Sequence, residues 1–372
     1  PFVPEQRPRE TRTCFPSCSR GVLDRALPTQ RPQMLRALTG EAEGSRYALQ
    51  IGSFCTLVAV QSTALLLFKI CQVGGTYTFS PASNVALTEM CKLGLASSLH
   101  ISHVNKARSE GSPSKGYLDG LSVRICLHYF GLAVLYTVNN QLTFLCFELA
   151  DPGSYALGKS VAPYLCAVML RLTGDKLNAL QWACIILQCS GIAVTQYDPC
   201  KHTGHLPARA YALIGLSTAI TAVSSVWNQK VVKGFDVPVN LQNSVLYVFG
   251  SLIAILSYAS GAMGPAHGLN GRVGFFEGYT WLAVSLVIWQ AFHGLAVTLV
   301  YKYADAIVKN FANSSVMAIL VVVSVYFFDL NASLTSWLGV LSVLVTTWVY
   351  MNIAIQMPKE VAPSEEKSGL LK

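Results

Sequence analysis

Charged residues are scarce in this sequence, and few of them fall within its long apolar stretches. Only 12% of the 372 residues are Asp, Glu, Lys or Arg, while 52% are hydrophobic. A typical soluble domain has about 25% charged residues, which cover its surface. A chain with so little charge cannot give every helix a charged face, so an ordinary soluble protein is excluded.

The sequence also lacks the short motifs of several enzyme classes. It contains no HExxH metal-binding pattern and no GxSxG nucleophile motif. Its seven His residues are dispersed, and His128 and His293 lie on apolar helices, where we expect a packing role. Its eleven Cys residues form no CxxC pair. We therefore predict a protein that is not an enzyme, binds no metal and carries no cofactor.

What the sequence does contain is a series of ten apolar stretches. A helix of about 20 residues crosses the hydrocarbon core of a bilayer, which is about 30 Å thick. The pattern predicts an all-α membrane protein with ten transmembrane helices. The predicted spans are residues 48–70, 79–102, 120–147, 153–172, 177–197, 208–229, 239–261, 279–300, 306–328 and 333–355.

The two ends of the chain differ from the membrane region. Residues 1–46 are rich in Pro and Arg and have no apolar periodicity, which predicts a disordered tail. Residues 358–372 form a second polar tail. The loops between the spans are short, so we expect residues 47–357 to form one domain.

The net charge of +8 raises the question of a nucleic acid partner. With ten spans, most of the 27 Lys and Arg residues fall in the tails and loops of one side of the membrane. Four fall on the other side: Lys69, Lys201, Arg209 and Arg272. This bias follows the positive-inside rule, so both termini are predicted to be cytosolic. The expected partner is the lipid bilayer and not a nucleic acid; a homodimer stays open.

The two halves of the membrane region resemble each other. The segments that begin at Ala150 and Ala304 both open with Ala-Asp, continue through a polar helix start with a Lys, become strongly apolar and reach a Trp. Five helices in each half would give the halves opposite orientations, as in many transporters. We predict two inverted five-helix repeats, over about residues 47–200 and 206–357.

Charges inside the spans are the first functional candidates, because a charge at bilayer depth must be paired or hydrated. Glu89 and Lys92 are three residues apart, so they share a helix face and can neutralise each other. The pair is either a structural ion pair that allows the helix to insert or a gate that shapes a polar cavity. Both interpretations stay open.

Polar side chains also gather around the third and fourth spans. Asn139, Asn140 and Gln141 are consecutive carboxamides in an apolar helix. They either hydrogen-bond to neighbouring helices or read the edge of a nucleobase. Tyr155 and Lys159 share one helix face at a spacing of four. This lysine either extends to the membrane surface or faces a phosphate.

The second half repeats this chemistry in VYKYADAIVKNFA, residues 300–312. Lys302, Tyr303 and Lys309 again combine lysine with aromatic rings. An anionic aromatic ligand such as a nucleotide needs a cation for its phosphate and a ring for its base. We predict that Lys159 and Lys302 share the phosphate charge.

Several motifs resemble the nucleotide-sugar transporters of the drug/metabolite transporter superfamily, over about residues 48–355. The motifs are LTEMCK, YTVNNQLTFL, LQW, SSVWNQKVVK, GFFEGYTW and VYKYADAIVKNFA. The family includes carriers of CMP-sialic acid, UDP-galactose and UDP-N-acetylglucosamine. The resemblance implies ten helices, a Golgi or endoplasmic reticulum membrane, and exchange of a cytosolic nucleotide sugar for a lumenal nucleoside monophosphate.

The resemblance also implies a set of substrate-binding residues. The family's pocket-lining tyrosine and asparagine fall on Tyr136 and Asn140. Other matched positions are Tyr155, Asn243, Lys302, Tyr303 and Lys309, and the local chemistry adds Asn139 and Lys159.

The sequence departs from the family pattern at several of these positions. The family's lysine in the fourth span would fall on Ala162, so we expect Lys159, one turn earlier, to replace it. Gln229 and Gln242 stand where the family has Glu and Arg. Two other functions stay open: a carrier of another phosphorylated or organic metabolite, and a membrane scaffold without transport.

Overall fold

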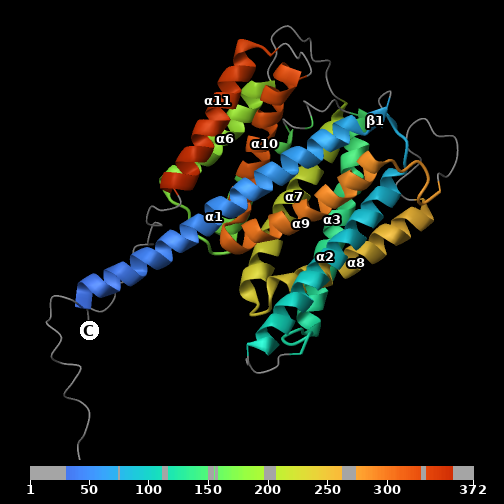
Figure 1. Ribbon diagram of the computed structural model, residues 1–372. Coiled ribbons are helices and arrows are strands. Elements are labelled where there is room, and N and C mark those ends of the chain that lie inside the picture. The colour runs from blue at the N-terminus through green and yellow to red at the C-terminus, as the bar shows by residue number, and fades with distance from the viewer. Residues whose placement is uncertain are drawn as a thin grey trace, which may run out of the picture. The chain divides into compact units, whose positions relative to one another are not determined.

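The structure is a computed structural model and describes residues 31–73, 76–110, 116–149, 155, 158–196, 207–261, 274–327 and 332–354. Apart from one short hairpin, the elements of this part of the chain are helices (Figure 1). They are α1 (Arg31–Ile70), α2 (Pro81–Ser109), α3 (Val123–Leu149), α5 (Ala162–Leu172), α6 (Ala179–Gln196), α7 (Ala208–Gly234), α8 (Val239–Ser260), α9 (Trp281–Tyr303), α10 (Ala306–Phe327) and α11 (Leu334–Val349), which continues into a π-helix (Tyr350–Ala354).

The hairpin lies between α1 and α2 and consists of β1 (Gln72–Val73) and β2 (Thr76–Tyr77). The two strands are antiparallel, with Gln72 opposite Tyr77 and Val73 opposite Thr76.

Local sequence signals explain where several helices begin and end. Ser80, Thr280 and Ser333 precede α2, α9 and α11, and each side-chain oxygen accepts a hydrogen bond from the backbone N–H three residues later. Such caps satisfy donors that have no partner inside the helix. Helix α8 ends at Gly261, whose φ of 70° is a left-handed conformation that glycine adopts at little cost.

Six helices or helix segments of the described chain are long and apolar enough to cross a membrane. They are Tyr47–Phe68, Ala208–Gly234, Val239–Ser260, Trp281–Tyr303, Ala306–Val323 and Leu334–Ile353. Helices α5 and α6 contain shorter apolar stretches. Helix α2, which carries Glu89 and Lys92, is not among the six. The protein is therefore a helical membrane protein.

Most predicted spans agree closely with the observed helices, and two differ. Helix α1 begins at Arg31, inside the segment 1–46 that was predicted to be disordered. Residues 31–46 are polar but contain many good helix formers, which a search for apolar stretches overlooks. The predicted span 153–172 is divided: Tyr155, Gly158 and Lys159 are helical, and α5 begins at Ala162, with Pro163 in its first turn, where proline is favoured. Residues 1–30 and the predicted C-terminal tail 358–372 lie outside the described residues.

Residues from Leu49 onward belong to one compact unit, and the part of α1 before it belongs to another. Within the larger unit, α2 packs against α8 and α9, and α3 packs against α7 and α8. Helix α6 packs against α11, which also contacts α10 (Figure 1). The helices that bring polar residues together are therefore held by neighbours from both halves of the sequence.

Two apolar clusters hold these helices together. One contains Tyr301, Phe311 and Tyr350, and the rings of Phe311 and Tyr350 stack with centroids 4.4 Å apart. The other joins α2, α3 and α8 and contains Tyr129 and Tyr247. Tyr301 and Tyr247 also line a cavity, so the packing of the core positions the walls of that cavity.

Candidate functional site

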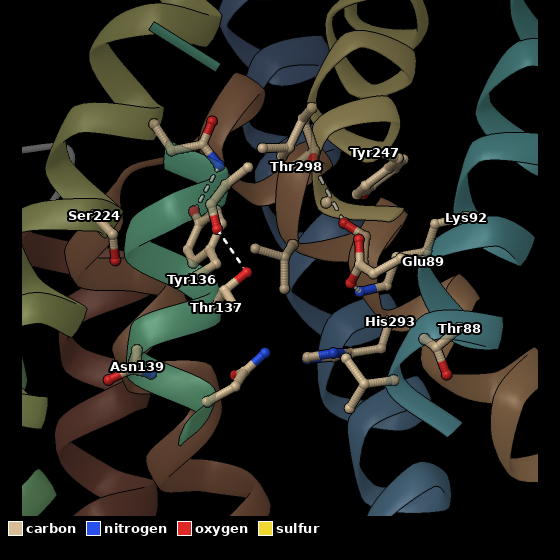
Figure 2. A pocket seen from close by; sticks show the side chains of 18 of the residues that line it. Thr88, Glu89, Lys92, Tyr136, Thr137, Asn139, Ser224, Tyr247, His293 and Thr298 are labelled. Carbon is tan, nitrogen blue, oxygen red and sulfur yellow. Dashed lines mark hydrogen bonds and ion pairs between the residues drawn. The ribbon is translucent and has the colours of Figure 1, made fainter. Parts of the chain in front are cut away.

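A cavity of about 400 Å³ lies among α2, α3, α7, α8, α9 and α10 (Figure 2). Its volume is within the range of small-molecule sites. The residues that line it recur at spacings of three and four along each helix, as expected when one helix face points inward. Its polar lining residues include Thr88, Glu89, Lys92, Tyr136, Asn139, Asn140, Thr221, Ser224, Ser225, Asn228, Gln290, His293, Thr298, Tyr301 and Lys309.

Helix α3 supplies an aromatic ring and two carboxamides to one wall of the cavity. Tyr136, Asn139 and Asn140 all line it. Asn228 of α7 donates a hydrogen bond from Nδ2 to the Tyr136 hydroxyl at 2.9 Å, which fixes the position of the ring. This wall therefore combines a flat apolar surface with groups that donate and accept hydrogen bonds.

Behind this wall, Lys159 is held by hydroxyl groups of α7. Its Nζ donates hydrogen bonds to Ser217 Oγ at 2.7 Å, Thr221 Oγ1 at 2.8 Å and the Ser217 carbonyl at 3.0 Å. The ring of Tyr155 lies beside it, with Nζ 5.5 Å from the ring centroid. Asn139 and Thr221 line the cavity and contact Lys159, so the lysine lies directly behind the cavity wall.

Lys309 lines the cavity itself, from the first turn of α10. The positive end of a helix dipole lies at its first turn, so it adds to the charge of this lysine. The charges of Lys309 and Lys159 interact with each other. Neither forms an ion pair in the part of the chain that the structure describes. Within the described residues, the site therefore has an excess of positive charge that no carboxylate balances.

Across the cavity, α2 and α9 form a second polar wall. We call Glu89, Lys92, Gln290 and His293 the α2–α9 wall. Figure 2 shows Glu89, Lys92 and His293 facing Tyr136 and Asn139. Lys92 Nζ lies 2.7 Å from Glu89 Oε1, so these two charges neutralise each other. The predicted ion pair therefore exists, and it faces a cavity.

The structure places the residues predicted from the sequence in three groups. Glu89, Lys92, Tyr136, Asn139, Asn140 and Lys309 line the cavity. Tyr155 and Lys159 lie behind its wall, as described above. Asn243 is buried in α8, and Lys302 and Tyr303 are exposed at the end of α9; these three do not line the cavity.

Lys302 does not line this cavity. Tyr301 lines the cavity, and consecutive residues of an α-helix point about 100° apart, so Lys302 points elsewhere. Lys309, one helix later, provides the charge at the cavity. The sharing of a phosphate charge by Lys159 and Lys302 stays a prediction.

Several cavity residues were missed by the sequence interpretation. His293 and Gln290 of α9 line the cavity, whereas a histidine on this apolar helix was expected to have a packing role. The hydroxyl and amide groups of α7 were also missed, although Thr221, Ser224 and Asn228 recur at helical spacing. That recurrence was the available signal.

The described residues contain no group of three or more His, Cys, Asp or Glu side chains that would hold a metal ion. What the fold and the cavity define is a helical membrane protein with a cavity among six helices that many polar side chains line.

A family model described as nucleotide-sugar transporter matches residues 46–351. The chain belongs to the nucleotide-sugar transporter family. It is 26% identical over 314 residues to CMP-sialic acid transporter 1 of Oryza sativa subsp. japonica, covering 82% of this chain and 95% of that protein. It is 28% identical over 319 residues to Probable UDP-sugar transporter protein SLC35A4 of Rattus norvegicus, covering 79% and 93%.

A further relative is CMP-sialic acid transporter 2 of Oryza sativa subsp. indica, 30% identical over 223 residues. That match covers 59% of this chain and spans only 61% of the relative's length. A solved structure described as "Crystal structure of protein" matches with a TM-score of 0.58 and 16% identity, over 84% of this chain and 98% of that one. This last likeness concerns the fold alone.

Proposed function

We propose that the protein carries a nucleotide sugar across an intracellular membrane in exchange for a nucleoside monophosphate. The observation that carries this proposal is the cavity in which Lys309 lies among aromatic rings and carboxamides and has no carboxylate partner among the residues that the structure describes. A buried cation without a partner favours an anionic ligand, because the ligand supplies the missing counter-charge.

The residues that line the cavity suggest where the base and the phosphate of the ligand lie. The base lies against Tyr136, and the carboxamides of Asn139 and Asn140 lie beside that ring on the same helix face. The phosphate lies toward Lys309, and Lys159 adds charge from behind the wall through its contacts with Asn139 and Thr221. Carboxamides and rings recognise the base, and lysines recognise the phosphate.

An alternating-access mechanism is supported by the way the helices pack. If the halves are inverted five-helix repeats, α2 corresponds to α8, α3 to α9, and α6 to α11. The packing of α2 on α9 then corresponds to the packing of α8 on α3, and both contacts are present. The contacts of α2 with α8 and of α6 with α11 join corresponding helices. Such pseudo-symmetry allows the two halves to rock around a central site.

The proposed location is the Golgi or endoplasmic reticulum membrane, with both termini in the cytosol, because most Lys and Arg fall on one side. In sealed vesicles with the cytosolic face outward, added protease should remove tags placed at either terminus. A tag that is protected until detergent is added would contradict this topology.

The direct test of the site is thermal stabilisation of the purified chain by a panel of nucleoside mono- and diphosphates. A ligand that binds only the folded state at 100 times its Kd contributes about 2.7 kcal/mol, which is easily measured as a rise in Tm. We expect at least one nucleotide to raise Tm, and inorganic phosphate or free sugars to have no effect. If no nucleotide raised Tm while another organic anion did, a carrier of that metabolite would be the better description.

A further inference from the structure

Among the described residues, some of the lysines around the cavity have an ion-pair partner and others do not. Lys309 and Lys159 have no ion-pair partner among the described residues. Lys92 is the cation of the α2–α9 wall, and it is already bound to Glu89 at 2.7 Å. The site therefore offers uncompensated positive charge at Lys309 and Lys159, and a charge-neutral wall at Glu89 and Lys92.

The Glu89–Lys92 pair is mostly buried and has close neighbours. Both side chains are less than a fifth exposed, at 18% and 17%. A Cβ atom on Gly250 would lie 2.8 Å from Glu89 Oε2, and a Cβ on Gly294 would lie 2.8 Å from Lys92 Cε. These two glycines leave just enough room for the pair. The ring of Tyr247 lies beside Lys92, with Nζ 5.6 Å from its centroid.

The same wall contains polar atoms that lack a protein partner. His293 Nε2 and Gln290 Nε2 are buried and make no hydrogen bond. The other amide atom of Gln290, Oε1, accepts a hydrogen bond from Thr88 at 3.3 Å, which orients the side chain. A hydroxyl group both donates and accepts, so it can satisfy an imidazole nitrogen and an amide N–H together.

We infer that the cargo is a nucleoside diphosphate sugar whose sugar is neutral, and that the α2–α9 wall selects against an acidic sugar. This inference rests on the proposed function and specifies its substrate class. Both negative charges of such a cargo lie on its diphosphate, where Lys309 and Lys159 balance them. The hydroxyl groups of the sugar occupy the unpartnered positions at His293 and Gln290.

An acidic sugar places its charge where the protein has no free cation. Its carboxylate would either lie against Glu89 and be repelled, or separate Lys92 from Glu89 and leave that carboxylate buried without a partner. Either outcome weakens binding. The class disfavoured in this way includes CMP-sialic acid, which has a single phosphate and a sugar carboxylate.

The test compares two ligands that differ only in the carboxylate. Dissociation constants of the full-length chain in lipid nanodiscs are measured for UDP-glucose and UDP-glucuronate, with CMP-sialic acid as a third ligand. If GDP binds more tightly than UDP, GDP-mannose and GDP-mannuronate replace the uridine pair. We expect the neutral sugar to bind roughly tenfold or more tightly than its acidic counterpart.

A variant then tests whether Glu89 causes the preference. Glu89→Gln keeps the shape of the side chain, removes its charge and frees Lys92. The ratio of the two Kd values should shift toward the acidic sugar by roughly tenfold, and adding Lys92→Met should reverse the shift. Each ratio compares two ligands bound to the same protein. The wild-type comparison therefore remains valid even if a variant fails to fold.

The outcomes separate this inference from the proposed function. If wild-type protein bound UDP-glucuronate or CMP-sialic acid as tightly as UDP-glucose, the inference would be overturned while nucleotide-sugar binding stood. A ratio unchanged by Glu89→Gln would overturn the role of the wall. If no nucleotide bound at all, the proposed function itself would fail.

Discussion

Replacing Lys309 with glutamine removes the charge that faces the cavity and keeps a polar side chain in its place. No carboxylate is left without a partner by this change, because Lys309 forms no ion pair in the described residues. A lysine in the protein interior without a counter-charge costs free energy. We therefore expect the Tm of ligand-free Lys309→Gln to equal or exceed that of the wild type.

The expected loss of nucleotide affinity follows from the interaction that is removed. A hydrogen bond between a charged amine and a phosphate contributes about 1.5–3 kcal/mol. Its loss should weaken nucleotide binding by roughly ten- to a hundred-fold. The nucleoside, which has no phosphate, should bind the variant and the wild type within about twofold of each other, because its contacts involve Tyr136 and the carboxamides.

Isothermal titration calorimetry with UDP and uridine measures both quantities on the same preparation. Lys302→Gln is the matched control, because Lys302 is on the neighbouring helix α9, is exposed and does not line the cavity. It should bind UDP with wild-type affinity. The site assignment would be refuted if Lys309→Gln bound UDP as tightly as the wild type, or if Lys302→Gln lost as much affinity.

Three further changes test the surroundings of the site. Lys159→Met loses the hydrogen bonds to Ser217 and Thr221, so calorimetry should find nucleotide binding weakened by roughly tenfold; unchanged affinity would make Lys159 a packing residue. Adding Ala162→Lys to this variant should not restore nucleotide binding, because Ala162 is only 3% exposed and a longer side chain there must displace its neighbours. Recovery of nucleotide affinity would show that a lysine at position 162 is equivalent to one at position 159. Gly250→Ala forces Glu89 to move, so the exchange rate in proteoliposomes should fall. Circular dichroism should still report a folded protein. An unchanged rate would mean that the Glu89–Lys92 pair tolerates displacement.

Much of the helix layout could be predicted from the sequence because apolar stretches and helices coincide in a membrane protein. Helix α10 was predicted at 306–328 and occupies Ala306–Phe327, and α8 was predicted at 239–261 and occupies Val239–Ser260. Prediction of helices from apolar stretches fails where a helix is not apolar, as in the first part of α1. A helix that continues beyond the apolar region carries polar residues there, so hydropathy cannot locate its end.

The residues of the site were harder to predict than the helices. Lys309 and Tyr136 stand out as polar groups in apolar surroundings, and both line the cavity. The sequence does not show how each helix is rotated about its axis, because a helix that is apolar on all sides has no pattern that marks its inner face. For this reason Lys302 was selected, and His293, which faces the cavity, was taken for a packing residue.

Transport by exchange is tested most directly in proteoliposomes that contain the purified full-length chain. Vesicles preloaded with a nucleoside monophosphate and vesicles loaded with buffer alone are given the same labelled nucleotide sugar. An exchanger whose cavity lysine, Lys309, forms no ion pair in the described residues needs an anion for the return step, so preloaded vesicles should take up label far faster. Equal rates in the two preparations would contradict obligatory exchange, and no uptake in either would contradict transport of that nucleotide sugar.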